Sequence, residues 1–333
     1  MQAPLTRPFR IGGVEVANRV LLAPLAGIGN WFVRLQARRH GAGLAVSEMV
    51  SSIALARRNE RTLRELLRIE PGERPVSIQL FGSDPGAMRT AARLAAAAGA
   101  DVIDINMGCP VRKVCRTGAG AALLRDHELA LSLVAAAAEG SGRPVTVKLR
   151  SGLAEGDRSG FELALRLART GLVAAIAFHP RSAAAHHGGR PDYALARELA
   201  AAVDVPVIIS GGLASAEAAR GAHAASGAAA VMIARGALGN PWIFAELTGR
   251  RDAPPTRAEV AAELAWTMER AAEHLGPERA NRWLRKLYPH YLARLGVRGP
   301  RADAFQRAAS LAEARRLLAR AAAWAPEPAT RAA

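Results

Sequence analysis

The chain contains little cysteine and no long apolar segment. Its two cysteines among 333 residues, Cys109 and Cys115, cannot supply a disulfide framework or a cysteine-rich zinc site, so both classes of protein are excluded and no metal ion is expected. No apolar run approaches the roughly 18 residues of a membrane-spanning helix, and residues 1–10 lack the pattern of a secretory signal. We therefore expect a cytoplasmic protein without a membrane partner.

Lysine is so rare that each one stands out. Of 45 basic residues, 42 are Arg and only Lys113, Lys148 and Lys286 are Lys. Where the composition favours Arg so strongly, a remaining Lys indicates a position that a planar guanidinium does not suit.

Charge of one sign dominates the sequence. The net charge is +16 and the isoelectric point is about 11.3, which favours a polyanionic partner, although an Arg- and Ala-rich composition can also reflect genomic base bias. Residues 250–333 hold 16 Lys or Arg and 9 Asp or Glu, so they carry +7 over 84 positions and leave +9 for the first 249. The C-terminal quarter is the more densely basic part.

Eight short apolar runs recur along the first 245 residues. They cover residues 20–23, 44–46, 76–78, 102–105, 145–147, 175–178, 207–209 and 230–233. The stretches between them, such as 88–98 and 129–139, are rich in Ala, Leu and Arg and predict helices. Eight strand and helix units predict an α/β fold, the (β/α)8 TIM barrel, followed by a small C-terminal helical bundle.

A short segment of distinctive residues follows each run. These segments are Pro24, Ser47-Glu48, Gln79, Asn106, Lys148-Leu149-Arg150, His179, Ser210-Gly211-Gly212 and Ala234-Arg235-Gly236. Active sites of TIM barrels lie at the carboxyl ends of the strands, so we expect these segments to form its rim. The loop after the fourth run adds Cys109 to Asn106. A lone Cys beside strands is more often a buried apolar residue than a catalyst, but the order of residues around Cys109 favours catalysis.

The last two rim segments predict a phosphate site. TIM barrels bind phosphate after strands seven and eight, where glycines such as Gly211 and Gly212 let backbone N–H groups approach the oxygens. Lys148 ends strand five, and a Lys near N1 and O2 of a flavin would stabilise its reduced, anionic form. These residues favour FMN over pyridoxal phosphate.

Beyond Trp242 the pattern is helical throughout. After a linker at residues 252–255, helices are predicted over 257–275, 280–295 and 302–323. We divide the chain into a barrel domain (1–248), a helical domain (249–325) and a disordered tail (326–333). Basic residues of the second helix region, Arg282, Arg285, Lys286, Arg294 and Arg298, suit phosphate contacts. The aromatic residues among them, Trp283, Tyr288 and Tyr291, are expected to form the core.

Seven motifs together resemble one enzyme family. They are Ala23-Pro24-Leu25-Ala26-Gly27, Ser47-Glu48-Met49, Gln79-Leu80-Phe81-Gly82, the run from Asp104 through Cys109-Pro110 to Leu124, Val147-Lys148-Leu149-Arg150-Ser151-Gly152, His179-Pro180-Arg181-Ser182 and Val231 to Trp242. The chain resembles the tRNA-dihydrouridine synthases, nearest the bacterial B-type, from about Pro8 to Leu318.

This resemblance implies an FMN enzyme that takes hydride from NADPH and reduces the C5–C6 double bond of a uridine in tRNA. Cys109 would protonate C5 as a general acid, which requires a thiol and not a thiolate. Asn106 and Arg150 match positions that hold the uracil edge. Cytoplasmic tRNA would be the partner, and we expect a monomer with no obligate protein partner.

The resemblance also implies the cofactor and RNA contacts. The flavin would contact Ala23, Pro24, Leu25, Gln79, Lys148 and His179, and the backbone of Gly211, Gly212, Ala234 and Arg235 would receive its phosphate. Lys113, Arg285 and Lys286 would contact the tRNA backbone. Simpler interpretations remain open: Gln79 caps a strand, His179 is a core residue, Lys113 is solvated, and Cys115 packs.

The chain departs from the family pattern in two places. Ser210-Gly211-Gly212 stands where the family has Asn-Gly-Asp, which removes an amide and a carboxylate near the cofactor. After strand six, His187 stands where an aromatic hydroxyl is expected beside the target base. An imidazole can stack and hydrogen-bond there.

Two other functions are compatible with parts of the sequence. A small-molecule FMN oxidoreductase of the dihydroorotate or ene-reductase kind would share the barrel and the flavin, but it explains neither the basic C-terminal region nor the loop at Cys109. A non-catalytic RNA-binding barrel is suggested by Ser210, Gly212 and His187, and Asn106, Cys109 and Lys148 argue against it.

Overall fold

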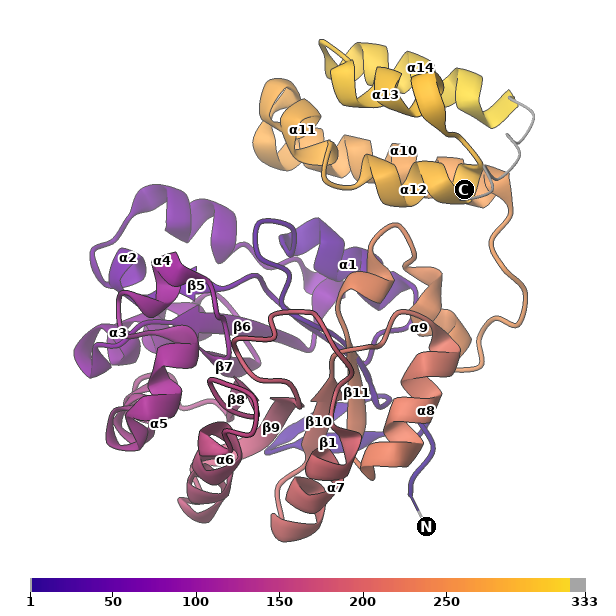
Figure 1. Ribbon diagram of the computed structural model, residues 1–333. Coiled ribbons are helices and arrows are strands. Elements are labelled where there is room, and N and C mark those ends of the chain that lie inside the picture. Colours follow the sequence, from indigo (N-terminus) through magenta and orange to yellow (C-terminus); the bar gives the residue numbers. More distant parts are fainter. Residues whose placement is uncertain (1, 324–333) are drawn as a thin grey trace. The chain divides into compact units, whose positions relative to one another are not determined.

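Eight parallel strands form a closed barrel in the computed structural model, which describes residues 2–323. They are β3 (Val20–Leu22), β4 (Leu44–Val46), β6 (Val76–Phe81), β7 (Val102–Met107), β8 (Val145–Arg150), β9 (Val173–His179), β10 (Val207–Ser210) and β11 (Ala230–Ile233). Neighbours pair in chain order, and the pairings of β11 with β3 and of β4 with β6 close the barrel. All eight coincide with the predicted apolar runs, so the TIM-barrel prediction is confirmed (Figure 1).

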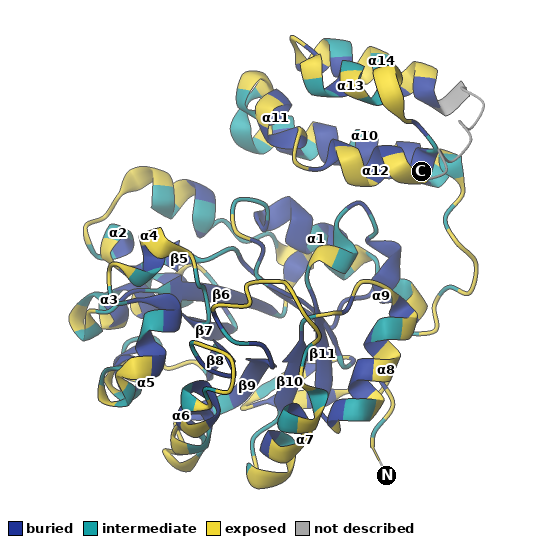
Figure 2. Cartoon of the chain, viewed as in Figure 1, coloured by how far each residue is buried: buried dark blue, intermediate teal, exposed yellow. Residues whose placement is uncertain are grey.

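Helices surround the barrel. The longer ones are α1 (Trp31–Arg39), α3 (Pro85–Ala97), α5 (His127–Ser141), α6 (Ser159–Arg169), α7 (Tyr193–Ala202) and α8 (Ala216–Ser226), followed by α9 (Trp242–Leu247). Side chains of Asp84 and Asp126 cap α3 and α5 by accepting from backbone N–H groups. The inner face of each helix is buried and its outer face is exposed (Figure 2). Alanines on that inner face, such as those of α3, let the helices pack closely on the strands.

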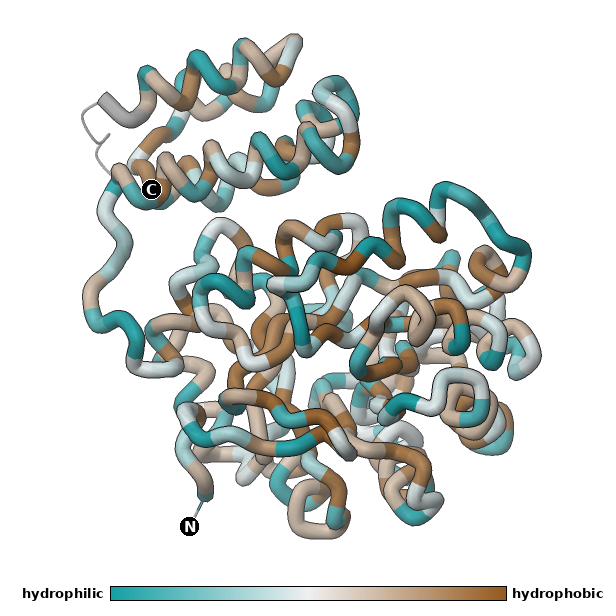
Figure 3. The backbone as a smooth tube through the Cα atoms, turned by 180° about the vertical axis from the view of Figure 1, so that it is seen from behind, coloured by the Kyte–Doolittle hydropathy of each residue, from teal (hydrophilic) through white to brown (hydrophobic). Residues whose placement is uncertain are grey.

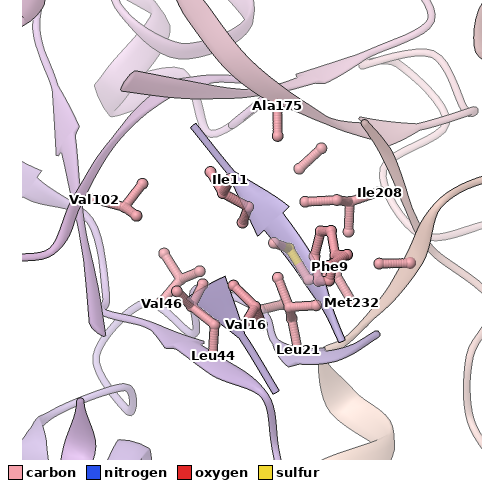
Figure 4. Packing of buried hydrophobic residues seen from close by; sticks show 13 residues of the cluster. Phe9, Ile11, Val16, Leu21, Leu44, Val46, Val102, Ala175, Ile208 and Met232 are labelled. Carbon is pink, nitrogen blue, oxygen red and sulfur yellow. The ribbon is translucent and has the colours of Figure 1, made fainter. Parts of the chain in front are cut away.

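An antiparallel hairpin that the sequence did not predict plugs the amino-terminal end of the barrel. It consists of β1 (Phe9–Ile11) and β2 (Val14–Val16). Its apolar side chains join a core cluster with barrel residues Leu21, Leu44, Val46, Val102, Ala175, Ile208 and Met232 (Figure 4). Runs of three residues are too short for a periodicity signal. The plug leaves the carboxyl end of the barrel for a site.

The chain divides into two compact units. The second unit comprises Ala237–Ile243 and the chain from Arg251 onward. Within it, α10 (Arg257–Leu275) has the predicted bounds. Hydrophobic and hydrophilic residues alternate along the helices of the second unit (Figure 3). Trp283, Tyr288 and Tyr291 are buried, as expected for core residues. The predicted disordered tail at 326–333 lies outside the described residues.

Two predicted C-terminal helices are each broken in two. The segment 280–295 forms α11 (Pro277–Leu284) and α12 (Tyr288–Leu295). Pro289 has no N–H to donate to the carbonyl of Arg285, and its ring would clash with that carbonyl in a continuous helix. The Gln306 side chain donates to this carbonyl instead.

The segment predicted as one helix over 302–323 forms α13 (Gly299–Arg307) and α14 (Leu311–Ala323). Ser310 starts α14 by accepting from the Glu313 N–H, and side-chain capping of this kind favours a helix start at that point.

None of the helices between residues 2 and 323 is both long and apolar enough to cross a bilayer.

A buried ion pair fixes the segment that leads into β6. Arg34 of α1 donates from Nε to Glu73 at 2.5 Å, and both side chains are at most 1% exposed. Arg34 also donates to the carbonyls of Gly29 and Arg68 at 3.0 and 2.7 Å. Burial raises the pKa of Glu73, and the guanidinium of Arg34 opposes that shift. Removing one partner would leave an unpaired buried charge.

We expect Glu73→Ala to lower the free energy of unfolding by about 3–5 kcal/mol, because Arg34 would stay buried without its counter-ion. Urea denaturation followed by circular dichroism measures this change. Glu198→Ala is the matched control, since it breaks an ion pair with Arg158 in which both side chains are exposed; such pairs contribute little. Equal decreases in the two variants would contradict the interpretation.

Candidate active site

The carboxyl ends of four neighbouring strands bring the predicted site residues together. In the strand register, Gln79 of β6 lies beside Asp104 of β7, and Asn106 of β7 lies beside Lys148 of β8. The next pair in the same direction is Arg150 of β8 with His179 of β9. Gln79, Asn106, Arg150 and His179 are all buried, as are Ala23 and Leu25 at the end of β3, whereas Pro24 and Lys148 are half-buried. The residues of the predicted rim on β6 to β9 therefore form a contiguous cluster.

A chain of hydrogen bonds runs through the cluster. Gln79 Nε2 donates to Asp104 Oδ2 at 2.6 Å, and Asn106 Nδ2 donates to Gln79 Oε1 at 2.9 Å. The Thr146 hydroxyl donates to the other oxygen of Asp104 at 2.6 Å. Sequence reasoning did not select Asp104 or Thr146. A signal was present, because Asp104 interrupts an otherwise apolar strand, Val102-Ile103-Asp104-Ile105.

The loop that carries Cys109 is held from two sides. Asn106 Oδ1 accepts from the N–H groups of Gly108 and Cys109 at 3.2 and 2.9 Å. The carbonyl of Cys109 accepts from the N–H of Ala121 at 3.0 Å and from the thiol of Cys115 at 3.3 Å. A Cβ on Gly120 would lie 2.7 Å from that carbonyl, so the close approach requires glycine.

Burial controls the charge of the ionisable groups. It raises the pKa of the Cys109 thiol, and the cations Arg150 and Lys148 oppose that shift only in part. It also lowers the pKa of Lys148 to about 8, with a further decrease from the neighbouring Arg150. At neutral pH Cys109 is therefore a thiol, as a general acid must be.

Arg150 holds two loops together. Its guanidinium donates to the carbonyls of Gly108 at 3.0 Å, Ser182 at 2.8 Å and His186 at 2.7 Å. Each of its three nitrogens thus binds the loop after β7 or the loop after β9. A contact with the uracil edge remains a prediction, and the geometry adds a positioning role that the sequence did not indicate.

Arg181, also absent from the predicted set, decides the proton position on His179. Its Nη1 lies 3.1 Å from His179 Nε2. A guanidinium only donates, so Nε2 must accept and the proton of the neutral imidazole lies on Nδ1. Burial and the cations Lys148, Arg150 and Arg181 lower the pKa of His179 well below its usual range, which keeps the ring neutral. His179 can therefore offer one N–H to a ligand.

The loops after β10 and β11 provide free backbone donors. Among the described residues, the N–H groups of Gly211, Gly212 and Ala234 have no acceptor. Gly211 and Gly212 have φ values of 96° and 78°, a region that favours glycine. A Cβ on Gly211 would lie 2.3 Å from the His179 ring. This cradle fits a phosphate held by backbone, and it needs no side chain at Ser210 or Gly212.

The remaining predicted residues are exposed. His187 lies in the loop after β9 and Lys113 lies on α4 (Arg112–Cys115), both in the first unit. Arg285 and Lys286 lie between α11 and α12 in the second unit. Although His187 is exposed overall, partial burial of its imidazole and the cations Arg235, Arg150 and Arg181 lower the pKa of His187.

Comparisons with known proteins identify the family. The family model described as dihydrouridine synthase (Dus) matches residues 21–323. The chain belongs to this family. It is 38% identical over 284 residues to tRNA-dihydrouridine synthase B of Xanthomonas axonopodis pv. citri, covering 84% of this chain and 85% of that protein. The enzyme of the same name from Pseudomonas aeruginosa is 39% identical over 303 residues, with coverages of 88% and 90%.

Solved structures of low sequence identity share the barrel. A 2-naphthoyl-CoA reductase aligns with a TM-score of 0.59 at 15% identity, over 75% of this chain and 53% of that chain. Morphinone reductase aligns with a TM-score of 0.56 at 17% identity, over 78% and 93%. At these identities the likeness establishes the fold alone.

The raised pKa of Cys109 can be measured by alkylation in a Cys115→Ala background. Iodoacetamide reacts with the thiolate, and a raised pKa lowers the thiolate fraction at any given pH. We expect slow alkylation at neutral pH and a rate that is still rising above pH 9. A rate that reaches its plateau below pH 8 would show a stabilised thiolate, and Cys109 could not then be a general acid.

Proposed function

We propose that this chain reduces a uridine of tRNA to 5,6-dihydrouridine, using FMN and NADPH, in the cytoplasm and as a monomer without an obligate protein partner. One observation carries the proposal: in a chain of the dihydrouridine synthase family, a buried hydrogen bond holds Asn106 and a partly buried one holds the Cys109 backbone at the mouth of the barrel. The structure around the mouth also fits the flavin.

The residues at the mouth match the parts of FMN. Backbone N–H groups of Gly211, Gly212 and Ala234, together with that of Arg235, would bind the phosphate. Among the described residues, Lys148 Nζ has no hydrogen-bond or ion-pair partner, so it can hold positive charge beside the isoalloxazine. Ala23, Pro24, Leu25, Gln79 and His179 would contact the ring. When bound, the flavin supplies the hydride that reaches uracil C6.

Cys109 completes the reduction. Its Sγ–H donates the proton to uracil C5, so that one hydride and one proton add across the C5–C6 bond. The thiolate that remains takes a proton from solvent, because burial favours the neutral thiol. Asn106, Arg150 and His187 would hold the base meanwhile.

A basic surface beside the mouth suits the RNA backbone. We call it the rim patch and define it as Arg57, Arg58, Arg112, Lys113 and Arg116. All five are exposed, and none has an ion-pair partner within residues 2–323. Unpaired cations of this kind bind phosphates and release counterions.

Two chain segments form the rim patch, and the loop after β6 joins them. A Cβ on Gly82 would lie 2.0 Å from Ser52 Oγ of α2 (Ser52–Ala56), and the Ser83 hydroxyl donates to the carbonyl of Thr117, just beyond α4. The segments also carry Ile53 and Val111, two of the three large apolar side chains that are exposed in the described part of the chain. Together they offer charge and apolar surface to an unpaired strand.

Nucleoside mass spectrometry tests the function. Purified protein with NADPH should convert uridine to dihydrouridine in tRNA that lacks this modification. Cys109→Ala should lower the rate at least about 100-fold, because the proton donor is removed, while NADPH still reduces the flavin. Cys115→Ala should affect the rate far less. No dihydrouridine from a protein that binds FMN and oxidises NADPH would contradict the proposed substrate.

The RNA contacts are tested by the salt dependence of tRNA binding. Arg57→Gln, Arg58→Gln and Arg112→Gln combined should weaken binding and reduce the slope of log K against log salt by about 0.7, the value for single strands, for each phosphate that the protein no longer neutralises. Arg285→Gln with Lys286→Gln should do likewise in the second unit. Arg93→Gln, Arg143→Gln and Arg169→Gln form the control, because these exposed residues lie on or beside the barrel helices, outside the rim patch. If the rim-patch variant matches this control, the rim patch does not bind RNA.

A further inference from the structure

Asp104 is a buried carboxylate to which neither the reaction nor the cofactor contacts assign a task. It lies on β7 and is 2% exposed. Both of its oxygens accept short hydrogen bonds, from the Thr146 hydroxyl and from the Gln79 amide, each at 2.6 Å. Burying an ionised group in a barrel core is costly unless it is fully hydrogen-bonded, and here the partners lead directly to the site.

The carboxylate fixes the direction of every hydrogen bond that follows. A carboxylate only accepts, so Gln79 must turn its NH2 group toward Asp104 and its oxygen toward Asn106. Asn106 must then donate to Gln79 and keep its oxygen for the N–H of Cys109, which only donates. Asp104 at one end of this series of hydrogen bonds and the N–H of Cys109 at the other each permit only one orientation of the two amides. Both ends require the same orientation.

We propose that Asp104 is a positioning residue that sets the amide orientations of Gln79 and Asn106 and thereby anchors the backbone of Cys109. The inference rests on the proposed function, since it assigns Asp104 to the residues that would hold flavin, base and proton donor. Both amide oxygens have partners within the protein: Gln79 Oε1 accepts from Asn106, and Asn106 Oδ1 accepts from the N–H of Cys109. Asn106 Nδ2 also donates to Met49 Sδ at 4.0 Å, and Gln79 Nε2 keeps one N–H that has no partner in the described chain.

The charge state of Asp104 is compatible with this role. Burial raises its pKa to about 6, and the hydrogen bonds from Gln79 and Thr146, with the charge of Lys148, limit the increase. Asp104 is thus ionised at neutral pH and presents two acceptors.

Asp104→Asn tests the proposal, because an amide at position 104 presents one acceptor and one donor where the carboxylate presented two acceptors. When the new amide keeps its oxygen on the Thr146 hydroxyl, its NH2 group turns the Gln79 oxygen toward position 104. Asn106 is then reversed, and the Asn106 NH2 group faces the N–H of Cys109. Two readouts need neither flavin nor tRNA: hydrogen exchange of the Cys109 backbone amide, and the alkylation rate of Cys109 at fixed pH in the Cys115→Ala background. We expect both rates to rise at least tenfold.

The double variant Asp104→Asn with Gln79→Glu is the rescue. The new carboxylate at position 79 accepts from the new amide at 104 and from Asn106, so Asn106 regains its orientation. Both rates should return to within about threefold of the wild-type values, although uridine reduction stays low because the remaining N–H of Gln79 is gone. Thr146→Val is the matched control: Asp104 loses a hydrogen bond of the same length, but the chain keeps its direction and Cys109 should be unaffected.

Three results would overturn the proposal: unchanged exchange and alkylation in both Asp104→Asn and Gln79→Met, failure of the double variant to restore the rates that Asp104→Asn raises, or an equal effect of Thr146→Val. If Asp104→Asn does not fold, Gln79→Met interrupts the same series of hydrogen bonds and should raise both rates. Unchanged rates in that variant would also overturn the proposal. These readouts do not depend on catalysis. Absence of dihydrouridine would therefore count against the proposed function and leave the role of Asp104 decided separately.

Discussion

Closure of the barrel is the constraint on which the site depends. The pairing of β4 with β6 completes a ring of parallel strands, so all their carboxyl ends share one rim. Residues as far apart in sequence as Gln79 and His179 thereby enter one cluster. At the other end, the hairpin of β1 and β2 fills the interior with apolar side chains (Figure 4). Polar groups can converge only where the barrel remains open.

Within that opening, desolvation governs the chemistry. Burial keeps Cys109 protonated and His179 neutral, and it brings the pKa of Lys148 to about 8. The same burial makes an unpaired donor or acceptor expensive. Connected hydrogen bonds avoid this penalty. Asp104 accepts from the Gln79 amide, and Arg150 donates to three carbonyls of the surrounding loops. The residues of the site are therefore held in one arrangement before a ligand binds.

The large positive charge of the chain has two separate uses. Arg34 and Arg150 are buried, and they hold the chain together by donating to carbonyls or a carboxylate. Other cations, such as Arg57 and Arg112 of the rim patch, are exposed and have no anionic partner in the described chain. A net charge of +16 counts both kinds equally. Only the exposed kind can steer a polyanion toward the site.

Sequence periodicity was sufficient for the barrel strands, because strands buried on both faces appear as continuous apolar runs. It failed where a signal is short or local. Examples are the three-residue strands of the hairpin, and the helix break at Pro289, whose missing N–H matters only if the surrounding residues are helical.

The sequence by itself determined the barrel, the family and the residue types at the rim, since each depends on order along the chain. The tertiary structure decided how those residues are used. Asp104 and Arg181 had no recognisable role until β6, β7 and β9 placed them against Gln79 and His179. Arg150 could not be assigned to the loops at Gly108 and His186 before these came within hydrogen-bond distance. Hydrogen-bond direction and desolvation depend on neighbours in space, and closure of the barrel supplies those neighbours.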